Sequence, residues 1–124
     1  MWRSKAWRRC EPAYVEFLCR PEKASALRTV MAIAERMPEI GKAFYETGPA
    51  FGIARVAAYL RAQTEAGVLT VADFEVAAAQ FMDACQSTLF KPVLFNFRQA
   101  PELSRIEHVV RIAVRTFMAA YAVR

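Results

Sequence analysis

The sequence predicts an all-α protein, a helical bundle of about five helices. Apolar residues recur at the three-to-four spacing of a helix face through most of residues 21–122. Prolines stand where helices would begin or end, and no segment alternates apolar and polar residues as a half-buried strand would. A chain of 124 residues that is 56% hydrophobic and 23% charged can bury one core, so we expect a single globular domain.

The first three expected helices are marked by prolines. Pro21 opens a helix that runs to about Arg36, because proline is favoured at the first helical position. Pro38 ends that helix, and a short second helix follows it. Pro49 begins the third helix, for which Gly67 is placed to form a left-handed C-terminal cap.

The last two expected helices are apolar on more than one side. The fourth runs from an Asp73 N-cap to about Leu89, with apolar rows at Phe74, Ala78, Phe81 and Cys85 and at Val76, Ala79 and Met82. The fifth runs from Pro101 to about Ala122, with Ile106, Val109, Val110, Ala113, Val114, Phe117, Met118 and Tyr121. A small chain has little core to cover these second faces, so we expect a partner subunit to cover them. In the alternative, both helices are central in a bundle closed within one chain.

The distribution of charge and the cysteine content indicate the nature of the N-terminal segment and the compartment of the protein. The net charge is +5, of which residues 1–20 supply five bases and two acids, or +3. We expect residues 1–15 to be a basic, poorly ordered remnant, and Pro12 to interrupt any helix there. Three cysteines without a CxxC pair (Cys10, Cys19, Cys85) indicate free thiols in a reducing compartment. With no secretory signal and no run long enough to span a membrane, we expect a cytoplasmic protein.

The sequence offers no catalytic or metal-binding pattern. His108 is the single histidine, and no cysteine lies three or four residues from it, so a zinc site lacks ligands. The chain has no P-loop, GxSxG or GxGxxG motif. We therefore expect neither an enzyme nor a bound metal or cofactor.

Two stretches carry a family resemblance. The words MPEIGKAFYETGPA and AAAQFMDAC, with the terminal VVRIAVRTFMAAYA, resemble the C-terminal domain of TetR-type transcriptional regulators of the AefR-like kind. The resemblance covers about residues 16–124. It implies a domain that binds a small, usually hydrophobic effector among its helices and dimerises through its last two long helices.

The resemblance also implies a helix-turn-helix unit ahead of this domain, which residues 1–15 are too few to hold. We therefore expect a regulator without its DNA-reading half, through a truncated or frameshifted gene or the choice of the expressed segment.

Candidate site residues follow from these expectations. Large or soft side chains on facing helices are candidate effector contacts, unless they only fill the core: Met31, Phe44, Tyr45, Tyr59, Phe81, Met82 and Cys85. Apolar residues of the last two long helices are the candidate dimer interface: Phe81, Cys85, Leu89, Val110, Val114, Phe117, Met118 and Tyr121.

Two functions remain open. In the first, the chain is a sensory and dimerisation domain that forms homodimers, is either silent or able to pair with an intact paralogue, and does not bind DNA specifically by itself. In the second, it is a small basic DNA-associated protein that uses the Arg, Lys and Trp residues of its first ten positions.

Overall fold

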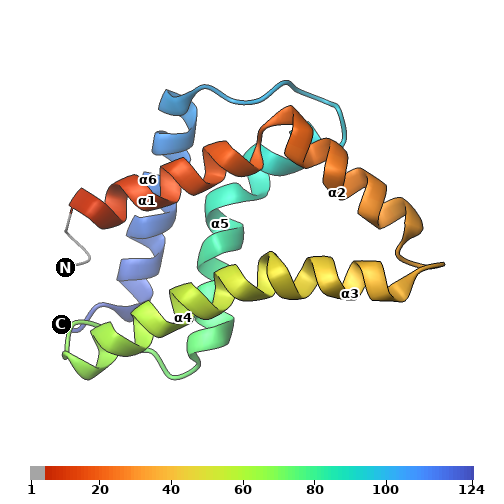
Figure 1. Ribbon diagram of the computed structural model, residues 1–124. Coiled ribbons are helices and arrows are strands. Elements are labelled where there is room, and N and C mark those ends of the chain that lie inside the picture. Colours follow the sequence, from red (N-terminus) through yellow and green to blue (C-terminus); the bar gives the residue numbers. More distant parts are fainter. Residues whose placement is uncertain (1–4) are drawn as a thin grey trace.

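The computed structural model describes residues 5–124, with side chains from residue 12 onward. Its helices are α1 (Lys5–Leu18), α2 (Pro21–Ile33), α3 (Pro38–Thr47), α4 (Pro49–Glu65), α5 (Phe74–Leu94) and α6 (Leu103–Tyr121) (Figure 1). Within residues 5–124 the β-type pairing is limited to one isolated bridge, between Leu69 and Ala122. The predicted all-α fold is confirmed, and the five expected helices correspond to α2–α6.

The prolines that were expected to open helices do so. Pro21, Pro38 and Pro49 each occupy the first turn of their helix, where the missing N–H has no intrahelical partner to lose. Gly67 adopts a φ of 80° beyond the end of α4. Its N–H donates to the Thr64 carbonyl at 3.1 Å, a pattern that satisfies carbonyls left open at a helix end. The predicted glycine cap is confirmed.

The expectation that Pro12 interrupts any N-terminal helix was wrong, because α1 continues through it. Packing accounts for the difference. Val15 and Cys19 lie on or just after α1 and are 0% and 1% exposed, within the core that α1 forms with α5 and α6. Burial of one face stabilises a helix more than a single proline destabilises it. The basic and tryptophan side chains of the first ten residues lie outside the described ones.

Helix α5 is the centre of the fold. The Asp73 carboxylate accepts a hydrogen bond from the Val76 N–H at 3.0 Å, so the predicted N-cap is confirmed. The helix runs beyond the expected end at Leu89, through Pro92, to Leu94. It contacts α1, α2, α4 and α6, which surround it (Figure 1).

The core consists of two clusters that meet at Phe117. One cluster lies among α1, α5 and α6 and is centred on residues such as Val15, Cys85 and Ile106. The other lies between α4, the α4–α5 loop and α5, and includes Leu60. Phe117 of α6 packs against both clusters, and its ring meets the Phe81 ring edge-on at a centroid distance of 5.3 Å.

Helices α2 and α3 form an arm, residues 21–47, that extends away from α6 (Figure 1). The arm is loosely packed: Ala24 is the buried residue of α2, and α3 has none. Helix α3 contacts α2 and α4 but does not approach α5. Arg28 fastens the arm to α5 by donating hydrogen bonds to the Leu94 carbonyl at 2.7 Å and the Val93 carbonyl at 3.1 Å.

The C-terminal end of the chain is clasped to the α4–α5 loop. The Thr70 N–H donates to the Tyr121 carbonyl at 2.8 Å, and the Val123 N–H donates to the Val68 carbonyl at 3.1 Å. The C-terminal end of α6 therefore lies beside the C-terminal end of α4 (Figure 1).

Candidate effector site and dimer surface

The structure separates the seven candidate effector residues. Met31 and Tyr45 lie on the arm and are 59% and 56% exposed. Phe44 is half-buried on α3. The other four lie on α4 and α5, where Phe81, Met82 and Cys85 are buried and Tyr59 is half-buried. The structure thus brings only part of the set together.

Tyr59 and Phe81 face a common cavity that is nearly filled. Its volume is about 10 Å³, and it is lined by Tyr59, Leu60, Leu69, Phe81, Val114, Phe117 and Met118. That is at most the space of one water molecule. Burial in this apolar surrounding raises the pKa of the Tyr59 hydroxyl above its usual value. An effector could enter here only if α4, α5 and α6 moved apart.

A second meeting point of helices was missed by the sequence reasoning. A Cβ added to Gly52 of α4 would lie 3.0 Å from Cε of Met82 and 3.5 Å from the Tyr14 hydroxyl oxygen. Gly52 therefore allows side chains of α1 and α5 to approach the backbone of α4 closely. The sequence signal for this contact is a glycine in the first turn of a helix, within the PAFG segment.

The next turn of α5 carries a buried acceptor atom without a hydrogen-bond partner in the described part of the chain. Gln86 lies one helical turn beyond Met82 on α5, so both side chains are on the same side of the helix. Its Oε1 atom is buried and accepts no hydrogen bond from residues 12–124. A buried acceptor of this kind favours a ligand or water with a donor group. Tyr14, Gly52, Met82 and Gln86 thus define a candidate effector site between α1, α4 and α5.

The candidate dimer residues lie mostly inside their own subunit. Phe81, Cys85, Leu89 and Val110 are between 1% and 4% exposed and belong to the core. Val114, Phe117, Met118 and Tyr121 are half-buried and pack against the core clusters. The expectation that these eight residues form a surface was wrong for the four buried ones. In the second apolar row of α5, Met82 is buried and Ala79 is half-buried within the chain, whereas Val76 is exposed.

The same two helices expose a different face. On α5 the exposed positions stand four residues apart, at Val76, Gln80, Ala84 and Thr88. On α6 they stand three or four apart, at Arg105, His108, Ile112, Thr116 and Ala119. The two rows adjoin, because Thr88 and Arg105 line one common groove. The α5–α6 face is hereafter the part of these rows beyond the groove, and it includes the apolar Ile112, which is 44% exposed. Its residues are Val76, Gln80 and Ala84 of α5 with His108, Ile112, Thr116 and Ala119 of α6.

Two further observations concern other kinds of site. Among residues 12–124, no three His, Cys, Asp or Glu side chains are grouped so that they could hold a metal ion. Within the described helices, none is both long and apolar enough to cross a bilayer.

Comparison with solved structures identifies proteins with a similar fold. The chain superimposes with a TM-score of 0.84 on a protein from Mesorhizobium loti MAFF303099 assigned to the TetR family of transcriptional regulators, at 24% identity over 94% of this chain and 57% of that one. It superimposes with a TM-score of 0.85 on the flavonoid-responsive regulator FrrA, at 25% identity over 97% of this chain and 61% of that one. The chain thus spans about three fifths of the length of these proteins.

A comparison with family models gives the membership. The search of curated proteins finds no match. The family model of the AefR-like transcriptional repressor C-terminal domain matches residues 7–123, so the match begins within α1 rather than at residue 16 as expected. Together with the fold, this match shows that the chain belongs to the family of AefR-like transcriptional repressor C-terminal domains.

Proposed function

We propose that this chain is a sensory and dimerisation domain: it binds a small, predominantly apolar effector between α1, α4, α5 and the arm, and it pairs with a second copy through the α5–α6 face. In this role it acts in the cytoplasm as the regulatory part of a TetR-type repressor. The same face would also admit an intact paralogue, which is the heterodimer that the sequence left open.

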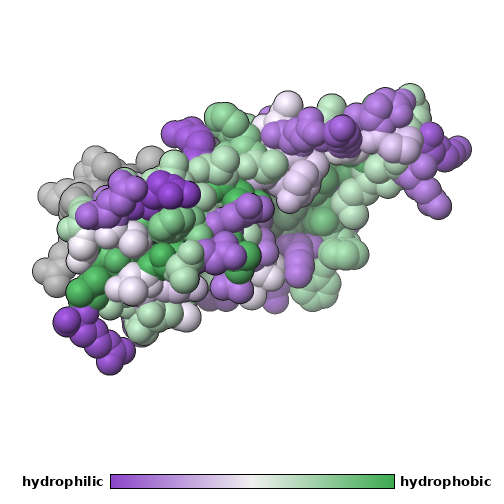
Figure 2. Space-filling model, turned by 90° about the horizontal axis from the view of Figure 1, so that it is seen from below, coloured by the Kyte–Doolittle hydropathy of each residue, from purple (hydrophilic) through white to green (hydrophobic). Residues whose placement is uncertain are grey.

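The incomplete packing of the arm is the observation that carries the effector proposal. Met31, Met37, Tyr45 and Phe51 lie on or beside the arm and are between 43% and 59% exposed. Seen from below, hydrophobic side chains are exposed in patches along the molecule, whereas hydrophilic ones cover the tip of the arm (Figure 2). Exposed apolar surface beside a few polar groups favours a ligand that covers it.

The polar groups at the candidate effector site would orient a bound effector. The buried Gln86 Oε1 would accept from a ligand hydroxyl, and the flat body of the ligand would lie against Gly52 in place of the Met82 and Tyr14 side chains. Since FrrA responds to flavonoids, a hydroxylated aromatic compound is the class we propose to test first. The arm, which is tied to α5 at one end, would move to admit it.

The effector proposal is tested with a flavanone, naringenin, as the probe. Gly52→Leu fills the site, so isothermal titration should show naringenin binding weakened at least about tenfold relative to the unchanged chain. Ala58→Leu, on the exposed side of the same helix, is the matched control and should bind as the unchanged chain does. Equal binding to both variants would place the ligand elsewhere and contradict the proposal.

The dimer proposal is carried by the α5–α6 face. Small side chains let two helices approach closely, and a two-fold pair of this face would form a four-helix arrangement. Ile112→Arg would bury an unpaired charge at the centre of the interface, so this variant should sediment as a monomer at about 20 µM. Ala54→Arg, exposed on α4, should remain dimeric. An unchanged chain that sediments as a monomer would refute the proposal.

The DNA-associated alternative rests on the first ten residues and on the charge of +5. Binding by charge alone falls steeply with salt. We expect fluorescence anisotropy of a labelled duplex to show only weak retention that disappears at physiological salt. Sequence-dependent nanomolar binding at that salt would favour this alternative.

A further inference from the structure

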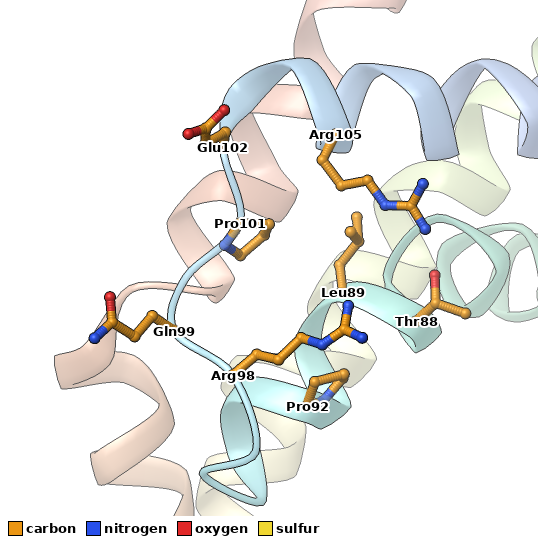
Figure 3. A pocket seen from close by; sticks show the side chains of 8 residues that line it. All are labelled: Thr88, Leu89, Pro92, Arg98, Gln99, Pro101, Glu102 and Arg105. Atoms are coloured by element: carbon orange, nitrogen blue, oxygen red, sulfur yellow. The ribbon is translucent and has the colours of Figure 1, made fainter.

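A groove lies where α5 ends and α6 begins. Its volume is about 270 Å³, and its walls come from α5, the connecting loop and the first turn of α6. Leu89, Pro92 and Pro101 give it an apolar floor, while Thr88, Arg98 and Arg105 supply polar groups (Figure 3). It is separate from the candidate effector site between α1, α4 and α5.

The two arginines converge on this groove. The Arg98 side chain extends from the connecting loop toward Leu89, and the Arg105 side chain extends from α6 toward Thr88 (Figure 3). The Phe97 ring supports Arg98, whose Cζ atom is 5.4 Å from the ring centroid. Two rigid donor groups from different segments therefore face one small volume.

Neither Arg98 nor Arg105 forms an ion pair within residues 12–124. The ion pairs in that range are Arg20–Glu16 and Lys42–Glu46, both remote from the groove in sequence. Glu102 also lines the groove, but its carboxylate points away from both guanidinium groups (Figure 3). Two facing cations with no acid between them attract an anion.

We infer that the groove binds a small carboxylate with an apolar body, held by Arg98, Arg105 and the Thr88 hydroxyl. Guanidinium groups match the planar geometry of a carboxylate and donate two hydrogen bonds to it. The apolar body lies on Leu89, Pro92 and Pro101.

The experiment uses benzoate as the probe, followed by amide chemical shifts of the full chain. Benzoate should bind saturably with a dissociation constant on the order of 1 mM, because the groove is open and its arginines are exposed. Arg98→Gln and Arg105→Gln should each weaken binding by about fivefold or more, and the double variant should abolish it. Arg111→Gln, exposed on α6 outside the groove, is the matched control and should bind unchanged.

Two other probes test the proposed ligand chemistry. Benzamide, which has the same shape without the charge, should not bind, and inorganic phosphate should bind more weakly than benzoate. Benzoate binding that survives in the double arginine variant, equal binding of benzamide, or stronger binding of phosphate would each overturn the inference. Gly52→Leu should leave benzoate binding intact, so that failure here is distinguishable from failure of the proposed effector site.

Discussion

Removal of the Arg28 side chain should loosen the arm while leaving the bundle folded. The Arg28 guanidinium donates from Nε to the Leu94 carbonyl at 2.7 Å and from Nη2 to the Val93 carbonyl at 3.1 Å. Both carbonyls belong to the last turn of α5, where the helix carries a partial negative charge. These bonds join segments more than sixty residues apart and connect α2 to the end of the central helix.

The magnitude follows from the exposure of each bond. A hydrogen bond to a charged group contributes about 1.5–3 kcal/mol, but the bond to Leu94 is exposed and water replaces it in the variant. The Val93 carbonyl also accepts from the Asn96 N–H at 3.0 Å, so it keeps a partner. We therefore expect Arg28→Met to lower the free energy of unfolding by about 1–2 kcal/mol, rather than the larger cost of breaking a fully buried pair.

The assays separate a local effect from a global one. For a chain of 124 residues, 1–2 kcal/mol corresponds to a fall in Tm of about 4–8 °C. Amides of α2 should lose hydrogen-exchange protection more than amides of α6 do. Arg28→Lys should recover only part of the loss, because one ammonium group does not reproduce the fork of the guanidinium.

Arg36→Met provides the matched control, since Arg36 is exposed at the other end of the same arm. It should change neither Tm nor exchange. If the Arg28 and Arg36 variants had the same Tm and the same exchange rates in α2, the anchoring role assigned to Arg28 would be refuted.

Three other outcomes are expected. In a Cys10→Ser background, Cys19 and Cys85 should not react with a thiol reagent at pH 8 until the chain is unfolded, because both are 1% exposed. Burial, and to a lesser extent the Glu16 carboxylate, raises the pKa of the Cys19 thiol to about 11 from 9.0, so the folded state keeps a proton that the unfolded state releases. Stability from this group is full below pH 9 and is lost as the pH rises toward 11, and Cys19→Ala should flatten that part of a plot of Tm against pH. Gly67→Ala should cost about 1 kcal/mol in a urea titration, since the φ of 80° strains any side chain; an unchanged midpoint would contradict this.

Local chemistry made the starts of α2, α3 and α4 predictable. Proline lacks an N–H, and at the first helical position that N–H would have no intrahelical partner. Helix starts at Pro21, Pro38 and Pro49 can therefore be predicted from the local sequence, without knowledge of the rest of the fold. The same residue type failed as a signal at Pro12, where α1 continues because its other residues are held by packing across the molecule. Helix α5 likewise continues through Pro92.

The faces of α5 were harder to predict. Periodicity shows that a helix has a second apolar row, but it does not show whether another helix of the same chain covers that row. Cys85 is buried because α1, which was expected to be interrupted at Pro12, packs beside α5 and α6. Because the packing of α1 was not anticipated, residues of the core were predicted to lie at the dimer interface. The exposed Ile112 and Thr116 were not among the predicted interface residues.

The clasp between residues 68–70 and 121–123 connects the helix of the candidate effector site to a helix of the α5–α6 face through main-chain hydrogen bonds alone. Helix α4 carries Gly52 of the candidate effector site and α6 carries Ile112 of the α5–α6 face, and both helices end at the clasp. A tilt of α4 therefore carries the end of α6 with it. Since the link consists of backbone hydrogen bonds, exchanging one side chain for another leaves it in place as long as the main-chain N–H remains. Proline at Thr70 or Val123, which removes a donor, would disconnect the two helices at this end.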